Sequence, residues 1–331
     1  MSSLFIDRQN VQLELDSGAL VFREGGERIG TVPLAPISRV FVRGSALMPA
    51  NLLGKLGDAG AGVVILSGRQ AQPTLMLSRP HSDARRRIAQ VKTYLDPDFC
   101  LAFARQLVQD KLTAHRQLLD ELLQSRPQQR YDLTRAARAL ERHMESIATA
   151  DTLASLRGVE GAAAGAWFGA LRAILPASME FTGRNRRPPR DPFNALLSLS
   201  YTLAGAEIVL ALHGSGLDPA IGYYHSISYG RHSLACDLLE PLRADIDRFC
   251  LRLLSEQTIT RDHFSTASGE GSACILGKAG RGRYYDAWEQ HATGTLRRTI
   301  GLHVQRLLQS IASAMPELAP DNPDGPEDSD I

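Results

Sequence analysis

A stretch at residues 221–247, IGYYHSISYGRHSLACDLLEPLRADID, combines two histidines and four carboxylates with an apolar pattern of helical spacing. Asp237 and Glu240 are three residues apart, so both would lie on one face of a helical turn. His225 precedes Glu240 by 15 residues across a predicted turn, so a loop histidine and a helix carboxylate can converge on one ion. His232 is the competing histidine because it is nearer to Asp237. The stretch is consistent with a metal site or with the solvent-facing side of an ordinary helix.

Another carboxylate stands inside a run of small apolar residues, LRGVEGAAAGAWFGAL, at residues 156–171. Glycine and alanine let a neighbouring helix or a ligand approach the backbone closely. Burial of Glu160 there is costly unless the carboxylate is paired or bound to a cation. The alternative is a helix-packing face on which Glu160 points to solvent or bridges an arginine such as Arg157.

A third group of residues has the chemistry to hold phosphate. Residues 183–190 contain no acid and four arginines, which are Arg184, Arg186, Arg187 and Arg190. Two prolines stiffen this segment, and Asp191 and Pro192 lead into a predicted helix. Each guanidinium offers a fork of donors that matches a pair of phosphate oxygens. The alternative is a solvated basic loop that merely precedes a helix.

One mechanism would use all three groups. A mixed set of histidine and carboxylate ligands with open positions suits Mg²⁺ or Mn²⁺ better than structural zinc. Such an ion would lower the pKa of an attacking hydroxyl and neutralise charge that builds on a phosphodiester. Nearby arginines would hold a nucleic-acid backbone, since phosphate contacts position nucleic acid without reading its sequence.

The elements that must position these residues change character along the chain. Residues 1–83 alternate as strands, with a hairpin at the Asp-Ser-Gly turn of residues 16–18 and one helix in PANLLGKLGDAG. From residue 84 to 315, apolar residues recur at helical intervals. We therefore expect an α+β protein, with a small N-terminal β-rich domain followed by a larger all-α catalytic domain. The predicted helices cover residues 84–124, 133–150, 152–175, 193–213, 233–256, where Pro241 kinks the helix or starts a second segment, and 285–315.

Charge is distributed unevenly along the chain. The whole sequence has a net charge of +1, but residues 316–331 hold six acids, four prolines and no lysine or arginine. This composition indicates a disordered acidic tail. Without it, 37 basic residues stand against 30 acidic ones, a net charge of about +7. Such an excess suits binding to a polyanion, although scattered surface charge would give the same count.

The cysteines and the chain start indicate a soluble cytoplasmic protein. The start, MSSLFIDRQN, lacks the apolar run of a signal peptide, and no segment approaches roughly 20 uninterrupted apolar residues. The cysteines are far apart and form no C-x-x-C pair, which argues against a zinc ribbon or a disulfide framework and fits a reducing compartment. They are Cys100, Cys236, Cys250 and Cys274.

Three sequence blocks together resemble one family. The blocks LRGVEGAAA, GRNRRPPRDPFNALLSLSYTL and GYYHSISYGRHSLACDLLEPLR occur in the order found in the CRISPR-associated adaptation integrase, the first-numbered protein of CRISPR systems. The segment VPLAPISRVFVRG, followed by a helix and then AGVVILSG, is similar to the β domain of that family. The resemblance covers roughly residues 1 to 310.

The resemblance implies a divalent-ion site formed by a glutamate, a histidine and a further carboxylate. On this sequence these residues are Glu160, His225 and Glu240. Asp237 matches a second acid of the same motif, which could share or assist the ion. The GYY element that precedes His225 favours it over His232. The implied cofactor is Mg²⁺ or Mn²⁺.

The implied activity is that of a DNA integrase and metal-dependent endonuclease. A 3′-hydroxyl of a short foreign DNA fragment attacks a phosphodiester at a CRISPR repeat boundary in double-stranded DNA. Family members are two-domain homodimers that pair largely through the β domain, and a small ferredoxin-like subunit, the second-numbered protein, bridges two such dimers. The rival interpretations are a metal-dependent nuclease that acts on branched DNA in repair, and a non-catalytic DNA-binding scaffold.

Further basic residues are candidates for contacts with DNA. Arg231 lies in the first stretch, and Lys278, Arg281 and Arg283 lie in LGKAGRGRYYDAWE, where the glycines predict a mobile cationic loop. The acidic tail would, by hypothesis, discourage nonspecific binding to DNA.

Overall fold

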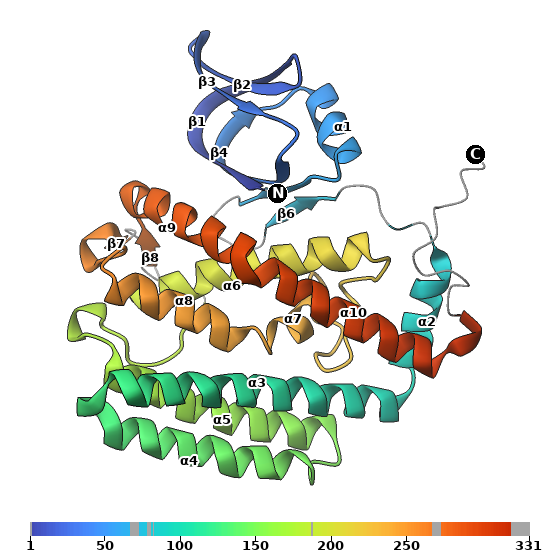
Figure 1. The fold of residues 1–331 in the computed structure, drawn as a ribbon, viewed down its shortest axis with the longest axis vertical. Helices are drawn as coiled ribbons and strands as arrows, with labels where there is room; N and C mark the ends of the chain where they lie inside the picture. Colours follow the sequence, from blue (N-terminus) through green and yellow to red (C-terminus); the bar gives the residue numbers. More distant parts are fainter. Residues whose placement is uncertain are drawn as a thin grey trace.

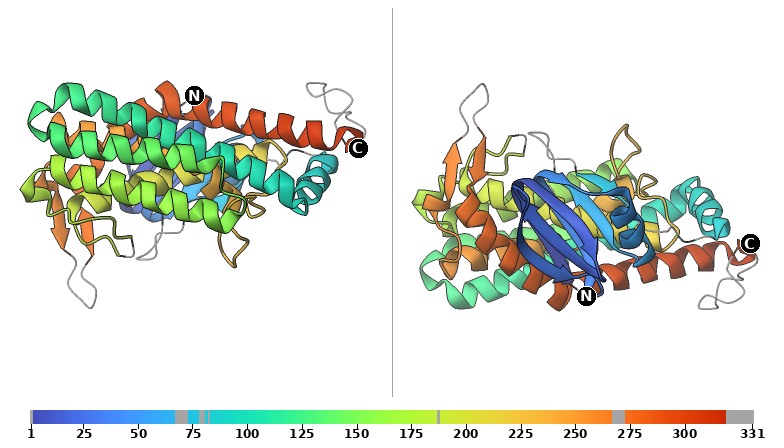
Figure 2. Two further views of the ribbon diagram at one scale, coloured as in Figure 1. Left: turned by 90° about the horizontal axis from the view of Figure 1, so that it is seen from below. Right: turned by 90° about the horizontal axis from the view of Figure 1, so that it is seen from above.

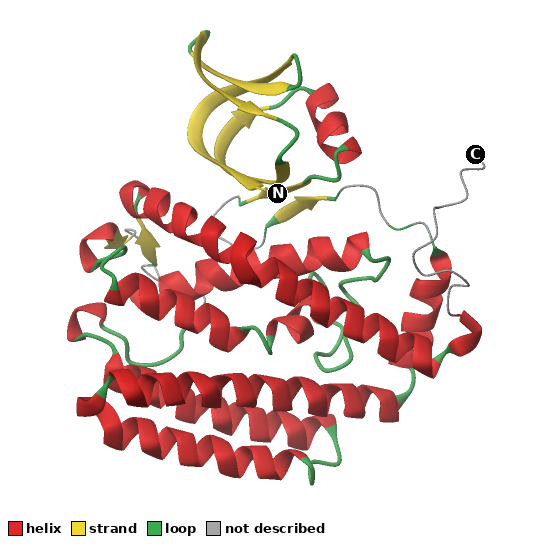
Figure 3. Cartoon of the chain, in the orientation of Figure 1, coloured by secondary structure: helices red, strands yellow, loops and turns green. Residues whose placement is uncertain are grey.

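The structure is a computed structural model that describes residues 2–66, 73–77, 81, 83–186, 188–266 and 273–318. A β-sheet and one helix lie at one end of the molecule, and helices form the rest (Figures 1 and 3). The view from above in Figure 2 shows that the sheet covers the middle of the helical part. The expected α+β fold, with a β-rich N-terminal part before a mostly helical one, is confirmed.

The larger sheet has the strand order β3-β2-β1-β4-β5-β6. The predicted hairpin is confirmed, because β1 and β2 pair antiparallel with Asp16 opposite Ala19, and both turn residues, Ser17 and Gly18, have positive φ. Strands β4 and β5 are parallel, which requires a crossover, and helix α1 provides it. The bounds are β1 Ser2–Asp16, β2 Ala19–Glu24, β3 Glu27–Pro33, β4 Ile37–Leu47, α1 Ala50–Asp58, β5 Gly62–Ile65 and β6 Thr74–Met76.

The helical part begins at Ala84, and each predicted helix has a counterpart there. The bounds are α2 Ala84–Tyr94, α3 Pro97–Ser125, α4 Arg130–Ile147, α5 Leu153–Ile174, α6 Pro192–Gly214, α7 Ser233–Leu239, α8 Arg243–Ser255, α9 Lys278–His291 and α10 Arg297–Ala314. A π-helical turn, Ala292–Leu296, joins α9 to α10, and two short strands, β7 Phe264–Thr266 and β8 Cys274–Leu276, form a hairpin before α9.

Two of the predicted helices are divided by proline. The single helix expected over residues 84–124 ends before Asp96, whose side chain caps α3 by accepting hydrogen bonds from the backbone N–H groups of Asp98 and Phe99. Pro97 fits the first helical position, where its missing N–H is not needed. Pro241 has the second of the two effects foreseen for it, because α7 ends at Leu239 and α8 starts at Arg243.

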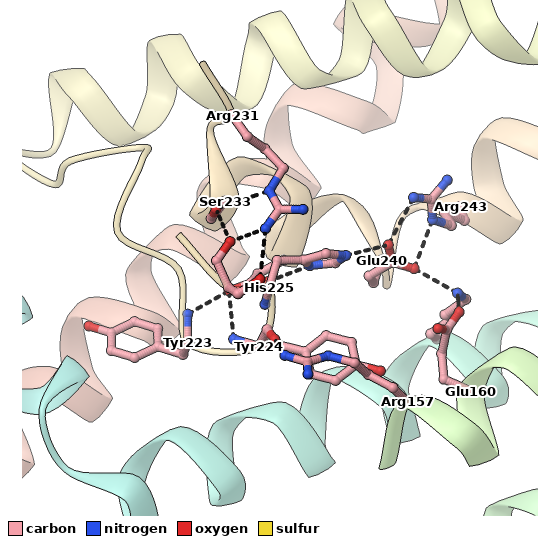
Figure 4. Close-up of polar contacts among 12 residues, drawn as sticks. Arg157, Glu160, Tyr223, Tyr224, His225, Arg231, Ser233, Glu240 and Arg243 are labelled. Atoms are coloured by element: carbon pink, nitrogen blue, oxygen red, sulfur yellow. Dashed lines mark hydrogen bonds and ion pairs between the residues drawn. The ribbon is translucent and has the colours of Figure 1, made fainter. Parts of the chain in front are cut away.

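Helix α6 forms the centre of the helical part. It is long and apolar enough to cross a membrane, but 72% of its most apolar window is buried inside the protein, as expected of a core helix. Figure 1 shows α6, α8 and α10 in one layer beneath the sheet, with α3, α4 and α5 packed together on the opposite side. The site residues discussed below come from α3 and α5, from α7 and its end, and from the loop before α7 (Figure 4).

Charged residues join the sheet to the helices around buried Glu207 of α6. One carboxylate oxygen accepts a hydrogen bond from Arg39 of β4 at 3.0 Å, and the other accepts from Arg297 of α10 at 2.8 Å. At the same junction, the backbone N–H of Ser3 donates to Glu289 at 2.7 Å. These contacts hold the sheet against α6, α9 and α10.

Part of the predicted acidic tail is ordered. Residues 316–318 form a 3₁₀ turn, Pro316–Leu318, and Glu317 lies 3.5 Å from the ammonium of Lys92 on α2. The short turn follows directly from α10, so helix packing extends order beyond the position at which composition alone predicts disorder. Residues 319–331 lie outside the described residues.

Candidate active site

Buried Asp237 on α7 organises the loop that carries the predicted histidine. One carboxylate oxygen accepts hydrogen bonds from the backbone N–H groups of Tyr223 and Tyr224 at 2.7 and 3.0 Å, and the other accepts from the N–H of His225 at 2.8 Å (Figure 4). A Cβ at Gly222 would lie 2.8 Å from the same carboxylate, so only glycine permits this approach. Asp237 is therefore saturated with donors and acts on the site through the loop.

The ring of His225 has a defined tautomer. Its Nδ1 lies 2.7 Å from a carboxylate oxygen of Asp237, which can only accept, so Nδ1 carries the proton and donates it. The other ring nitrogen, Nε2, lies 3.9 Å from Glu240 Oε1. A carboxylate that orients a histidine in this way is the usual arrangement behind metal-binding imidazoles. His225 thus turns Nε2 towards Glu240.

Glu240 is buried among cations. Arg243 donates from Nε and Nη2 to the two carboxylate oxygens, both at 2.8 Å, and the Lys111 ammonium lies 2.6 Å from Oε2. Burial alone would raise the pKa of this carboxyl, but Arg243 and Lys111 outweigh that effect and hold the pKa well below its usual range. Glu240 is therefore ionised at neutral pH.

Glu160 approaches the same point from helix α5. Its carboxylate contacts the ammonium of Lys111, which comes from α3, and its side chain is 22% exposed. The alternative bridge to Arg157 does not form, because Arg157 donates instead to the backbone carbonyl of Tyr224 at 2.6 Å (Figure 4). Lys111 therefore links Glu160 and Glu240, which come from helices far apart in the sequence.

The glycine-rich face of α5 points away from its neighbours. A Cβ added at Gly158, Gly161 or Gly165 would meet no atom within 4 Å. Helix α5 packs instead through residues such as Leu156 and Trp167, which are fully or almost fully buried. The helix-packing interpretation of the small residues is therefore wrong for these three glycines, which lie on the exposed side of α5.

A small pocket of about 40 Å³ lies next to the two glutamates. Its lining includes Lys111, His115, Glu160, Trp167, Arg186 and Arg243. At its base, buried Asp247 accepts hydrogen bonds from Trp167 Nε1 at 2.8 Å and from the hydroxyl of Tyr201. Burial and the charge of Asp247 raise the pKa of Tyr201 well above its usual value, so this tyrosine remains protonated. Asp247, Trp167 and Tyr201 thus form a hydrogen-bond network on one side of the pocket. Lys111, Glu160, Arg186 and Arg243 add charged groups to its lining.

Within residues 221–247, His232 and Asp245 are not brought to this point, whereas Asp247 lines the pocket. His232 is exposed at the start of α7. Asp245 lies 3.1 Å from His291 and 3.3 Å from Arg248, on the side of α8 that packs towards α9. Of the two histidines, His225 is the one whose ring approaches Glu240.

The donor chemistry of the site fits a hard divalent ion. Two carboxylates and the Nε2 atom of one imidazole lie near one another, and the space between the carboxylates already holds a cationic group, the ammonium of Lys111. As they stand, no three histidine, cysteine, aspartate or glutamate side chains within the described ranges are spaced to hold a metal. The residue types of Glu160, His225 and Glu240 suit such an ion, and Lys111 lies between the two glutamates.

The arginines expected to bind phosphate differ in their contacts and their exposure. Arg184 donates to Asn194 Oδ1 at 2.7 Å and stacks over the ring of Tyr201, and burial lowers its pKa to about 10. It is a structural residue. Arg186 and Arg190 are exposed, and Arg186 also lines the pocket beside Glu160. Arg187 lies outside the described residues.

Arg231 is engaged within its own loop. Its guanidinium donates to the backbone carbonyl of Ser226 and, at 3.3 Å, to the hydroxyl of Ser233 (Figure 4). These contacts close the loop that follows His225. Arg231 therefore braces the site in this structure, whatever contact it makes with DNA.

The predicted mobile loop around Arg281 is wrong, because Lys278, Arg281 and Arg283 lie in α9. Apolar packing of residues such as Trp288 stabilises this helix and outweighs the low helix propensity of its glycines. Arg281 donates to both carboxylate oxygens of Asp7 on β1, at 2.7 and 3.2 Å, and so joins α9 to the sheet. Lys278 and Arg283 are exposed.

Sequence reasoning missed Lys111 and Arg243, the cations that neutralise the two glutamates. A signal for Lys111 was present: it follows Leu107 and Val108 at helical spacing on the apolar face of α3, where a lysine is out of place. Arg243 had a weaker signal, because it stands three residues after Glu240, but Pro241 between them obscures the helical register.

Comparisons with known proteins identify related sequences. Residues 4–290 match the family model described as CRISPR associated protein Cas1. A CRISPR-associated endonuclease Cas1 from Thermodesulfovibrio yellowstonii is 35% identical over 291 residues, which cover 88% of this chain and 91% of that protein. A second, from Thermus thermophilus, is 35% identical over 271 residues, covering 81% of this chain and 77% of that protein.

Solved structures share the fold. A casposase bound to integration product aligns with a TM-score of 0.82 at 21% identity, covering 95% of this chain and 91% of that chain. A Cas1 protein from Thermotoga maritima gives 0.81 at 20% identity, covering 94% and 97%. A chain of a Cas6-RT-Cas1–Cas2 complex gives 0.79 at 22% identity, covering 98% of this chain and 36% of that chain.

Proposed function

The chain belongs to the CRISPR-associated Cas1 family of endonucleases and integrases, and we propose that it is a divalent-metal-dependent DNA integrase of CRISPR adaptation. It would join the 3′-hydroxyl ends of short foreign DNA to the CRISPR repeat by transesterification. The new phosphodiester bond forms as an existing one breaks, the attacking hydroxyl loses its proton, and the departing 3′-oxygen gains one. Hydrolysis of a phosphodiester by water would be the endonuclease reaction of the same site.

The observation that supports this proposal best is the convergence of Glu160, His225 and Glu240. They come from α5, from the loop before α7 and from the end of α7. Lys111 contacts both glutamates, and His225 Nε2 lies 3.9 Å from Glu240. A scaffold without chemistry has no need to gather two glutamates and an oriented imidazole beside a basic loop. Convergence of such groups in a pocket is typical of catalytic sites.

Each residue of the candidate site has a definable part in the proposed reaction. Glu160, His225 and Glu240 would hold Mg²⁺ or Mn²⁺, which supplies Lewis-acid activation of the hydroxyl and neutralises phosphoryl charge. Asp237 keeps the proton of His225 on Nδ1 and so leaves Nε2 free. Arg243 holds the carboxylate of Glu240 in one orientation through two hydrogen bonds.

Exposed arginines would bind the DNA backbone next to this site. Arg186 lines the pocket that contains Glu160, so a phosphate bound to it would lie near the carboxylates. Arg190 is exposed on the same loop. Lys278 and Arg283, exposed on α9, are further candidates on a different face. Such contacts position a DNA strand without reading its sequence.

We also propose that the active form is a homodimer that assembles with a small ferredoxin-like subunit on double-stranded DNA. Support comes from the fold shared with a Cas6-RT-Cas1–Cas2 complex and with a casposase bound to integration product. The proposed location is the cytoplasm, which agrees with the free thiols of Cys100, Cys236, Cys250 and Cys274.

The test is strand transfer on a branched DNA that mimics a half-integrated product. The wild-type protein is assayed with Mn²⁺, Mg²⁺ or EDTA, beside Glu160→Ala, His225→Ala and Glu240→Ala proteins shown to be folded by circular dichroism. Glu256→Ala is the matched control, because Glu256 is an exposed glutamate outside the site. We expect rejoined DNA only with metal, retained by the control and lost in the three site variants.

Other outcomes separate the rival functions. Metal-dependent cleavage of the branched DNA without rejoining would favour a repair nuclease. DNA binding with no metal-dependent product in any wild-type reaction, including reactions supplemented with the small subunit, would favour a non-catalytic scaffold.

A further inference from the structure

Lys111 occupies the point at which a metal ion would be expected. Its side chain is only 7% exposed, and its ammonium contacts a carboxylate oxygen of Glu160 and, at 2.6 Å, one of Glu240. These three residues come from α3, α5 and the end of α7. A buried lysine is unusual unless it is paired, and here both partners are predicted ligands of the ion.

Either the ammonium of Lys111 or a divalent ion would neutralise the two glutamates. Two carboxylates close to one point repel each other, and burial strengthens that repulsion because little water screens it. Lys111 supplies one positive charge between them. Arg243 supplies another, but only to Glu240, since both of its hydrogen bonds go to that carboxylate. Without the ammonium, Glu160 would lose its closest cationic partner.

The pocket beside Lys111 gives the ammonium a place to go. The pocket of about 40 Å³ is lined by Lys111 itself, together with Glu160, Arg186 and Arg243. A lysine side chain has a flexible four-carbon stem, so the ammonium can swing without movement of the α3 backbone. The carboxylates can therefore exchange one cation for another.

We propose that Lys111 is a resident counter-cation that competes with the divalent ion for Glu160 and Glu240 and so sets the metal affinity of the site. The ammonium stabilises the metal-free protein by neutralising the two glutamates. Ion binding displaces it into the pocket. This inference rests on the proposed function, because it requires that the two glutamates bind a metal ion.

The test is a titration of the full chain with Mn²⁺ in the absence of DNA, in which electron paramagnetic resonance measures the concentration of free ion. Lys111→Met removes the ammonium and retains the length of the side chain. We expect the Kd for Mn²⁺ to fall by about 10- to 100-fold, the size of typical coupling between two ligands of one protein. In EDTA the melting temperature of this variant should fall below that of the wild type, and saturating Mn²⁺ should raise it by more than it raises the wild type.

Arg116→Met is the matched control. Arg116 lies on the same helix and pairs with Asp120 and Glu141, which are not site residues. Its loss removes one positive charge from α3 and should leave the Mn²⁺ affinity unchanged. Lys111→Gln, a second uncharged variant, serves if the methionine protein does not fold without metal, and it should also bind Mn²⁺ more tightly than the wild type.

The outcomes distinguish this inference from the proposed function. Mn²⁺ binding that is equal in the wild type and the Lys111 variants, and lost in Glu160→Ala, would overturn the competition and leave the metal site intact. Weaker binding in the Lys111 variants would also overturn it, because the lysine would then support the ion. If neither the wild type nor the Lys111 variants bind Mn²⁺, the metal-dependent function fails and this inference fails with it.

Discussion

The two halves of the candidate site are held by different kinds of interaction. In the half around His225, Asp237 binds backbone N–H groups that lie 12 to 14 positions away in the sequence. In the half around Glu160 and Glu240, Lys111 forms ion pairs across 49 and 129 positions. The first half depends on one saturated carboxylate in a short segment, and the second on charge balance among distant helices.

This difference separates the geometry of the site from its electrostatics. In the His225 half, hydrogen bonds from N–H groups satisfy the carboxylate of Asp237, so no cation is needed there. This half should therefore keep its shape with or without metal. The Glu160 half contains charges that require a neutralising partner, so its stability should depend on which cation is present. Substitutions in the first half should therefore affect folding most strongly, and those in the second should affect metal binding and chemistry.

The largest expected effect is on stability, from Asp237→Ala. The substitution leaves three backbone donors, two of them buried, and the ring N–H of His225 without their acceptor. We expect the free energy of unfolding, measured by urea denaturation in EDTA, to fall by about 3–5 kcal/mol.

Asp245→Ala provides the comparison for that measurement. Asp245 lies on α8, the helix after α7, but its side chain is 37% exposed and pairs with His291 and Arg248. Its loss should lower the free energy of unfolding by about 1 kcal/mol or less. If the two variants lose equal stability, Asp237 does not organise the His225 half in the way described.

The next effect is on rate, from Glu160→Gln. A glutamine keeps an oxygen that can accept a hydrogen bond from Lys111, so the free energy of unfolding should change by less than ~1 kcal/mol. The strand-transfer rate should fall about 100-fold, or ~2.7 kcal/mol, because the neutral amide binds a hard divalent ion poorly. A stability loss as large as that of Asp237→Ala, with little loss of rate, would reverse the comparison between the halves.

The order of the strands and helices was largely predictable, because it follows from local patterns. The hairpin at Ser17 and Gly18 and the helix that became α1 depend on turn residues and apolar spacing nearby in sequence. The strands β7 and β8 escaped prediction because each has only three residues, too few for alternation to show. The error at α9 had a different cause, because tertiary packing around Trp288 overrides its glycines.

The site was predictable only in part. Glu160, His225 and Glu240 came from resemblance to a family, whereas their spacing alone left both the metal and the solvent-facing interpretations open. Lys111 could have been suspected, since it interrupts the apolar face of α3. Its pairing with Glu160 and Glu240 could not, because a sequence pattern does not show which distant helices face each other.

A smaller effect on stability is expected from Arg243→Gln, which tests the charged half directly. The substitution removes two hydrogen bonds from Glu240 and leaves Lys111 as its remaining cation. The free energy of unfolding in EDTA should fall by about 1–3 kcal/mol, as for a lost charged hydrogen bond. Arg248→Gln, which removes exposed pairs with Glu121 and Asp245, should lower it by less than ~1 kcal/mol. An equal loss in the two variants would mean that the charges around Glu240 are no more critical than surface charges.

The smallest effect concerns DNA binding and separates exposed arginines from those used in the fold. Arg186→Ala removes an exposed guanidinium beside the pocket, so binding to duplex DNA should weaken, and the slope of log K against log salt should decrease by about 0.9 in magnitude. Arg231→Ala opens the braced loop after His225 and should leave that slope unchanged while it slows strand transfer. If Arg231→Ala also reduces the slope, the brace itself contacts phosphate, and the His225 half would then bind DNA as well as orient the imidazole.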